Sequence, residues 1–118
     1  MNAMRRKDRE LTPEQAWEIV DRCADGVVSM LDETGAPYAV PVNIVREDDR
    51  VYFHSAMAGK KTDCMRKSPR VCVTCVESGA EIDQPGLTTR YASAILTGTA
   101  AEVTDAAEKV NALRLLCR

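Results

Sequence analysis

Hydrophobic and polar residues alternate with the period of β-strands along much of this chain, and apolar residues follow helical spacing in three shorter stretches. Alternating runs separated by short polar turns predict five strands, at residues 26–31, 38–45, 51–54, 70–77 and 91–103. Most connections are too short for parallel crossovers, so the strands are expected to pair antiparallel. The pattern therefore predicts a mainly β fold of the α+β class, in which a curled sheet closes towards a small barrel and short helices cover its ends.

Three helices complete the predicted arrangement. The first begins after Thr12, where Gln15 completes a capping box, and Gly26 is expected to end it. A short second helix is expected over residues 59–68. A third begins at residue 104 and continues to the end of the chain. Because no glycine, proline or capping residue ends the third helix, we expect the domain to have a C-terminal segment that this chain lacks.

Length and composition favour a single globular domain over residues 1–118. The chain has 45% hydrophobic residues and a net charge of -2, so a core is feasible and no basic surface field attracts nucleic acid or anionic lipid. No apolar run approaches the roughly 20 residues that cross a bilayer. The basic first nine residues are not followed by the apolar stretch of a secretory signal. We therefore expect a cytoplasmic protein that binds neither nucleic acid nor membrane.

The five cysteines do not predict a disulfide framework or a metal site. Cys72 and Cys75 form a CxxC pattern, but the pattern lies within a strand, where positions three apart point to opposite faces of the sheet. The two thiols therefore cannot share a metal ion. We expect the cysteines to be free in a reducing compartment and to pack as small apolar residues.

Two residues and one segment mark irregular positions among the predicted strands. Pro41 cannot donate a hydrogen bond to a ladder, so the second strand is expected to be an edge, a bulge or a break there, leaving backbone groups free for a ligand. Gly98 is expected to form a bulge in the fifth strand. Residues 78–89 are polar and contain glycine and proline, so they are expected to form a loop.

The candidate chemistry gathers where the third strand passes into the second helix. His54, the only histidine, and Ser55 end the strand, and Gly59 precedes Lys60 and Lys61 at the start of the helix. A hydroxyl, free backbone N–H groups and two ammonium groups at a helix N-terminus are what a phosphate group needs. The segment therefore predicts a phosphate-binding site, with His54 facing whatever the phosphate anchors.

Each of these residues also has an ordinary structural interpretation. A lone histidine at a strand end is commonly a packing residue, Ser55 could serve only as a helix cap, and adjacent lysines are commonly solvated helix charges. Consecutive helical positions diverge by about 100°, so Lys60 and Lys61 reach one phosphate only from the first turn of the helix. Their place directly after Gly59 meets that condition, and we therefore favour the phosphate-binding interpretation.

Several segments, in this order, resemble one known family. They are MRRKDRELT at 4–12, YAVPVN at 38–43, YFHSA at 52–56, GKK at 59–61, SPRV at 68–71, TTRYAS at 88–93 and ALRLLC at 112–117. The chain resembles the pyridoxamine 5′-phosphate oxidase-like, FMN-binding split-barrel superfamily, and most closely its nitroimidazole-resistance branch. The resemblance covers nearly the whole chain. It implies an antiparallel split β-barrel with short flanking helices that forms a homodimer, with two FMN sites at the subunit interface.

The resemblance also assigns the cofactor-binding residues. Backbone groups at Pro41, Val42 and Asn43 would run along the edge of the isoalloxazine ring. The ribityl-phosphate arm would lie at His54 and Ser55, and the phosphate would be held by Lys60 and Lys61. The oxidase itself usually has Arg-Lys where this chain has Lys-Lys, which replaces a bidentate fork with a point charge. The residues that grip pyridoxine phosphate lie in a C-terminal part that this chain lacks, so vitamin synthesis is not supported.

The function that the resemblance implies is electron transfer through a bound flavin. The branch suggests an oxidoreductase that passes electrons from a reduced nicotinamide or a protein donor to a small acceptor such as a nitroaromatic compound, with His54 as the catalytic candidate. The alternative is a non-catalytic flavin- or haem-binding protein of the same fold, in which His54 would ligate the haem iron.

Overall fold

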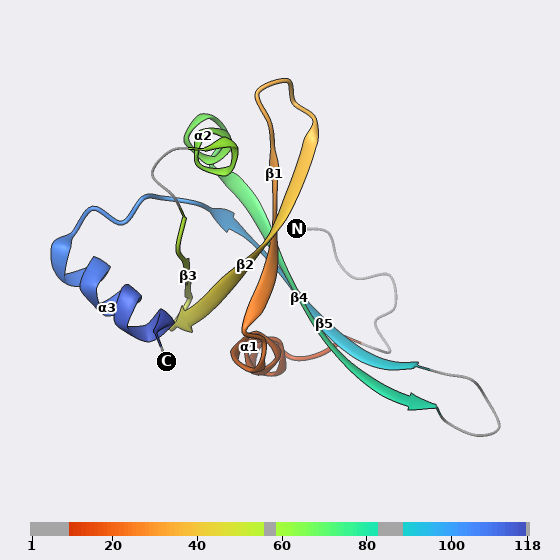
Figure 1. Ribbon diagram of the computed structural model, residues 1–118. Helices are drawn as coiled ribbons and strands as arrows, with labels where there is room; N and C mark the ends of the chain where they lie inside the picture. The colour runs from red at the N-terminus through yellow and green to blue at the C-terminus, as the bar shows by residue number, and fades with distance from the viewer. Residues whose placement is uncertain (1–9, 56–58, 83–88, 118) are drawn as a thin grey trace.

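The computed structural model describes residues 10–55, 59–82 and 89–117, which form one curled antiparallel sheet with three short helices (Figure 1). The five strands lie in the order β3-β2-β1-β4-β5, so the sheet is a half-barrel with β3 and β5 at its edges. This arrangement confirms the predicted fold class. The elements are α1 (Pro13–Arg22), β1 (Asp25–Leu31), β2 (Pro37–Glu47), β3 (Arg50–Phe53), α2 (Lys60–Lys67), β4 (Arg70–Ile82), β5 (Thr89–Thr99) and α3 (Ala106–Leu116).

The inner face of the sheet carries the main hydrophobic core. Along β1, Val28 and Met30 are buried whereas Val27 and Leu31 are exposed, because successive side chains of a strand point to opposite faces. Helix α1 packs against this inner face at β4 and β5. The buried members of the core are Ile19, Val20, Val28, Met30, Val42, Ile44, Cys64, Val73, Cys75 and Ala94.

The first helix begins as predicted but ends earlier. The Thr12 hydroxyl accepts a hydrogen bond from the Gln15 backbone N–H at 3.2 Å, and the Gln15 side chain accepts one from the Thr12 N–H at 2.8 Å. This capping box is confirmed. Gly26 does not end the helix, which stops at Arg22; Gly26 is instead a buried residue of β1. A Cβ at Gly26 would lie 3.2 Å from the Ile44 side chain, so close packing explains the glycine there.

The β4–β5 hairpin is longer than the sequence predicts. Residues 78–82 belong to β4 rather than to a loop, and they continue the pairing with the first residues of β5. The register shift lies between Gly79 and Ile82, whereas Gly98 pairs with Val71 in an unbroken ladder. The bulge expected at Gly98 was therefore wrong. Local composition favoured a loop, but the hydrogen bonds of a long two-stranded ribbon outweigh it. Residues 83–88 lie outside the described part of the chain.

Pro41 lies where one side of β2 has no partner strand among the described residues. β1 pairs with β2 without interruption from Asn43 to Pro37, so there is no break or bulge at the proline. β3 pairs only with residues 44–47 of β2. The strand is therefore an edge at Pro41, which is one of the three predicted possibilities and needs no N–H donor on that side.

A second, smaller cluster packs α3 against the other face of the β2–β3 hairpin (Figure 1). Val45 and Tyr52, which pair across the hairpin, form this cluster with Ala112 of α3. The adjacent residues Ile44 and Phe53 belong to the main core instead. Successive hairpin residues therefore serve two different packing layers, one beneath α1 and one beneath α3.

The CxxC thiols lie on opposite faces of β4, as predicted. Cys75 is fully buried in the core, whereas Cys72 is half-buried on the other face in register with Ser29 of β1. Burial, followed by the neighbouring Cys23 thiol, raises the pKa of the Cys75 thiol to about 11, so it stays protonated at neutral pH. Within the described residues, no helix has the length and apolar character needed to span a bilayer.

Candidate functional site

The junction between β3 and α2 brings two hydroxyl groups together. β3 ends at Phe53, His54 and Ser55 follow it, and α2 begins at Lys60. The Ser55 and Thr62 hydroxyl oxygens are 3.0 Å apart, so the end of the strand is hydrogen-bonded to the first turn of the helix. Thr62 was not predicted as a site residue. Its place directly after the lysine pair, in the same first turn as Lys61, is the signal that could have identified it.

The start of α2 has the features of an anion-binding helix terminus. Its N-cap is Gly59, with φ of 141°, and no side chain in the described part of the chain caps the helix there. A φ in this range favours glycine, so the chain can make this turn only because residue 59 lacks a side chain. The first N–H groups of a helix have no intrahelical partner and carry the positive end of the helix dipole. The two lysines therefore add mobile positive charge to a fixed positive terminus.

Beside this junction lies a cleft of ≈ 1030 Å³ bordered by β3, α2, the end of β5 and α3. His54, Ser55 and Thr62 line it, and His54 is exposed. Its walls include apolar side chains such as Val73 and Leu96, which belong to or pack against the main core. A cleft of this volume, with apolar walls and a few converging polar groups, has the general character of a small-molecule site.

Two ion pairs lie along the cleft. Arg66 of α2 donates to Glu102 at 3.0 Å, and Arg50 of β3 donates to Glu108 of α3 at 2.6 Å. All four residues line the cleft. These guanidinium groups are already paired with carboxylates, which makes them less available for an added anion.

Lys60 points away from the cleft and towards the β1–β2 hairpin. Its ammonium nitrogen lies 4.4 Å from the centre of the Tyr38 ring, within the range of a cation–π interaction. Neither Lys60 nor Lys61 lines the cleft, although both belong to the first turn of α2. The structure thus brings the Ser55 and Thr62 hydroxyls together and places the predicted cations beside them on the helix.

The turn that faces Lys60 carries a carboxylate with a lowered pKa. Asp32 accepts hydrogen bonds from the Thr34 hydroxyl at 2.7 Å, the Thr34 N–H at 2.9 Å and the Ala36 N–H at 2.9 Å. The Thr34 hydroxyl, then these backbone donors and the positive charge of Lys60, lower the pKa of the Asp32 carboxyl. The carboxylate is therefore ionised at neutral pH and attracts the Lys60 ammonium.

The three residues predicted at the flavin ring lie on β2, but their side chains do not share one face. Val42 is buried in the main core, whereas Pro41 and Asn43 are exposed on the opposite face of the sheet. Pro41 lies opposite Val27 of β1, and β3 does not cover this part of β2. Any ligand at Val42 would therefore contact the backbone of Val42 and not its side chain, which is the kind of contact that the family resemblance implies.

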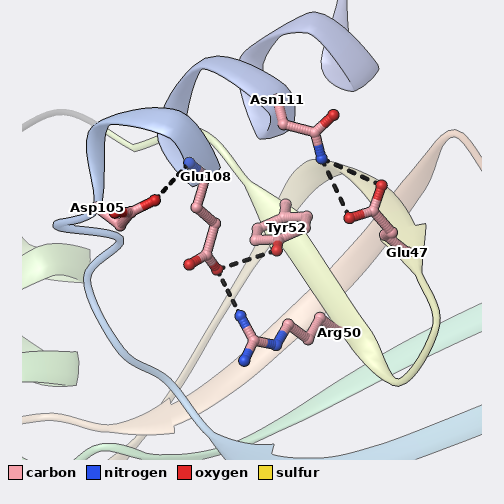
Figure 2. Close-up of polar contacts among 6 residues, drawn as sticks. All are labelled: Glu47, Arg50, Tyr52, Asp105, Glu108 and Asn111. Atoms are coloured by element: carbon pink, nitrogen blue, oxygen red, sulfur yellow. Dashed lines mark hydrogen bonds and ion pairs between the residues drawn. The ribbon is translucent and has the colours of Figure 1, made fainter.

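A polar network fastens α3 to the β2–β3 hairpin on one side of the cleft (Figure 2). The Arg50 guanidinium and the Tyr52 hydroxyl both donate to one carboxylate oxygen of Glu108, at 2.6 and 3.0 Å. The Asn111 amide donates to both oxygens of Glu47 at 3.1 Å. These bonds fix the wall of the cleft opposite α2. No group of three or more potential metal ligands is found within residues 10–55, 59–82 and 89–117.

The chain matches the family model described as pyridoxamine 5′-phosphate oxidase over residues 12–118. None of the curated proteins matches it significantly. Among solved structures, a candidate 5-nitroimidazole antibiotic resistance protein of Bacteroides thetaiotaomicron is 25% identical, with a TM-score of 0.80 over 92% of this chain and 66% of that one. A FAD-binding protein of Mesorhizobium loti is 26% identical, with a TM-score of 0.74 over 91% and 74%.

The flavocytochrome Anf3 of Azotobacter vinelandii is 25% identical, with a TM-score of 0.73 over 89% of this chain and 50% of that one. This chain thus spans between half and three quarters of the length of these three structures.

Replacing Glu108 with Ala should loosen the α3 wall of the cleft. The change removes a carboxylate that accepts two charge-assisted hydrogen bonds, from the Arg50 guanidinium and from the hydroxyl of the buried Tyr52, so we expect a loss of about 1–2 kcal/mol in the free energy of unfolding. Urea unfolding measures this loss of stability. Glu102→Ala is the matched control, because its partner Arg66 is exposed; its effect should stay below about 0.5 kcal/mol. Equal losses in the two variants would contradict this role of Glu108.

Proposed function

The chain belongs to the pyridoxamine 5′-phosphate oxidase family, and from this membership we propose that it is a flavoprotein that binds FMN at the junction of β3 and α2. The observation that carries the proposal is the hydrogen bond of 3.0 Å between the hydroxyl of Ser55, just after β3, and that of Thr62 in the first turn of α2, next to Lys60 and Lys61. This donor set suits a phosphate dianion. The relatives described as a FAD-binding protein and a flavocytochrome support a flavin in this fold.

The residues of this chain would bind the cofactor in two parts. Ser55, Lys60 and Lys61 would hold the phosphate, and the backbone of Pro41 to Asn43 would border the ring. Two observations fit this assignment: the exposed flank of β2 at Pro41, and the lack of a side-chain cap on α2 among the residues that the structure describes. When bound, FMN would supply transfer of one or two electrons to a small acceptor.

The proposed reaction is reduction of a small acceptor such as a nitroaromatic compound, with electrons from a reduced nicotinamide or a protein donor. The similarity to a candidate nitroimidazole resistance protein supports this acceptor class. His54 would supply a proton to the acceptor from its ring nitrogen, because it is exposed, lines the cleft and directly precedes Ser55. The cytoplasmic location stays a prediction from the sequence.

A visible absorption spectrum of the purified protein, with and without added FMN, tests the cofactor. We expect flavin bands near about 375 and 450 nm. An intense Soret band after addition of haem, without flavin binding, would instead support the alternative of a haem-binding protein. If neither cofactor changed the spectrum, both proposals would be wrong.

A titration with FMN, followed by the same absorption spectrum, locates the phosphate site. Replacing Lys60 and Lys61 together with Ala should weaken FMN binding by about 1–3 kcal/mol for each lost charged contact, and it should leave riboflavin binding unchanged because riboflavin has no phosphate. Lys67→Ala, in the last turn of the same helix, is the control for a general loss of positive charge. Unchanged FMN affinity in the double variant would refute the phosphate assignment.

His54 is tested at saturating FMN, so that cofactor affinity does not limit the rate. We expect His54→Gln to lower the rate of nitroimidazole reduction by about 100-fold, the usual scale for loss of a general acid, while the flavin spectrum of the loaded protein is retained. Product formation under anaerobic conditions gives the rate. A rate equal to that of the unmodified protein would return His54 to an ordinary strand-end role.

We also propose that the protein is a homodimer that uses the outer face of its sheet. Pro41, Val27, Thr74 and Ile95 form one row across β2, β1, β4 and β5 on the face opposite the core. Val27 and Ile95 are 40% and 52% exposed, and Val76 on the same face is 57% exposed. Exposed apolar patches of this kind mark interaction sites. A second copy on this face would lie against the exposed flank of β2, so the cofactor site would lie at the subunit interface.

Ile95→Asp places a charge at the β5 end of this row and should shift the protein towards monomer by at least tenfold in the dimer dissociation constant, since a buried unpaired charge is costly. Sedimentation velocity measures the shift. Val110→Asp is the matched control, because Val110 is 67% exposed on α3. If the two variants behaved alike, the outer face of the sheet would not be the interface.

A further inference from the structure

Lys60 is held by a residue that is distant in sequence and that the family resemblance did not assign to the site. Its ammonium nitrogen lies over the ring of Tyr38, 4.4 Å from the ring centre, although the two residues belong to α2 and to the start of β2. Lys60 itself is exposed. The contact therefore fixes a side chain that would otherwise move freely in solvent.

The Tyr38 ring is a rigid support for this contact. Tyr38 pairs with Met30 across the β1–β2 ladder, and Met30 is only 4% exposed. Tyr38 is half-buried and packs against the main core. One part of the ring is therefore anchored in the core, and one face remains available to the lysine.

The hairpin turn adds a weaker electrostatic attraction. The Asp32 carboxylate is fixed by three hydrogen bonds from Thr34 and Ala36, and its negative charge attracts the ammonium group of Lys60. The β1–β2 hairpin thus presents both an aromatic face and a negative charge to the first residue of α2. An ammonium group has three N–H donors, and contact with a ring face leaves donors free for a ligand oxygen.

We propose that Tyr38 is a positioning residue for phosphate recognition: its ring orients the Lys60 ammonium at the start of α2 before the cofactor arrives. This inference rests on the proposed FMN function. A lysine side chain with four rotatable bonds loses rotamer freedom when it binds a phosphate. Because Tyr38 restricts that freedom beforehand, less is lost on binding. Tyr38 should therefore affect the affinity only for ligands that carry the phosphate.

The test compares FMN with riboflavin in two variants. Tyr38→Leu removes the ring but keeps an apolar side chain against the core, and we expect it to raise the Kd for FMN by about two- to fivefold, the scale of an exposed cation–π contact. Riboflavin affinity should not change. Tyr38→Phe keeps the ring and should bind both flavins as the unmodified protein does. Fluorescence quenching of the flavin measures the six dissociation constants, for the two variants and the unmodified protein with each ligand.

A double-variant cycle shows whether Tyr38 acts through Lys60. In a Lys60→Met background, Tyr38→Leu should have no further effect on FMN binding, because the ammonium that it positions is gone. An undiminished effect in that background would overturn the inference, as would an equal loss of FMN and riboflavin binding in Tyr38→Leu. In either case the flavin function would stand.

A measurement without flavin keeps the inference testable if Tyr38→Leu does not fold. A ring face above the Lys60 side chain shifts the NMR signals of its ε-methylene protons upfield, and Tyr38→Phe should retain that shift. Ordinary solvent-exposed chemical shifts in the unmodified protein would overturn the inference. Failure of the unmodified protein to bind FMN would instead overturn the proposed function, and with it the role of Tyr38 in phosphate recognition.

Discussion

The alternation of buried and exposed side chains along β1 fixes the register of the whole sheet. β1 is the central strand and pairs with both β2 and β4. A slip by one residue would expose Val28 and Met30 and bury the opposite set, so the core permits only one register. That register places Tyr38 opposite Met30 on the inner side and Pro41 opposite Val27 on the outer side. The positions of the residues around the proposed cofactor site therefore follow from the packing of one strand.

Features that depend on neighbouring residues could be predicted from the sequence, and features that depend on distant contacts could not. The capping box at Thr12 is local, and it occurs as expected. Gly26 was misassigned because the glycine there accommodates the close approach of the Ile44 and Val73 side chains from other strands. The extra length of the β4–β5 hairpin likewise depends on pairing between strands, which composition alone does not reveal.

In the candidate site, too, the features set by neighbouring residues could be predicted and those set by distant contacts could not. The hydroxyl and the lysines at the β3–α2 junction lie within a few residues of one another, so the sequence pattern could bring them together. Tyr38 could not be linked to Lys60, because the contact depends on how α2 lies against the β1–β2 hairpin. The outward direction of Pro41 and Asn43 also depends on the sheet register rather than on local sequence. These residues stay predictions as cofactor contacts, but their placement on the outer face links the site to the proposed dimer.

The charge balance of the chain explains why the orientation of one lysine matters. A net charge of -2 gives no long-range attraction to a phosphate dianion, and exposed charges farther away than about 8 Å are largely screened at physiological ionic strength. Affinity for a phosphate must then come from cations in direct contact with it. An arginine has a planar fork that is already suited to a phosphate, whereas a lysine is a flexible point charge. In the proposed site, the fixed Tyr38 ring gives Lys60 part of the preorganisation that an arginine at the same position would have from its own geometry.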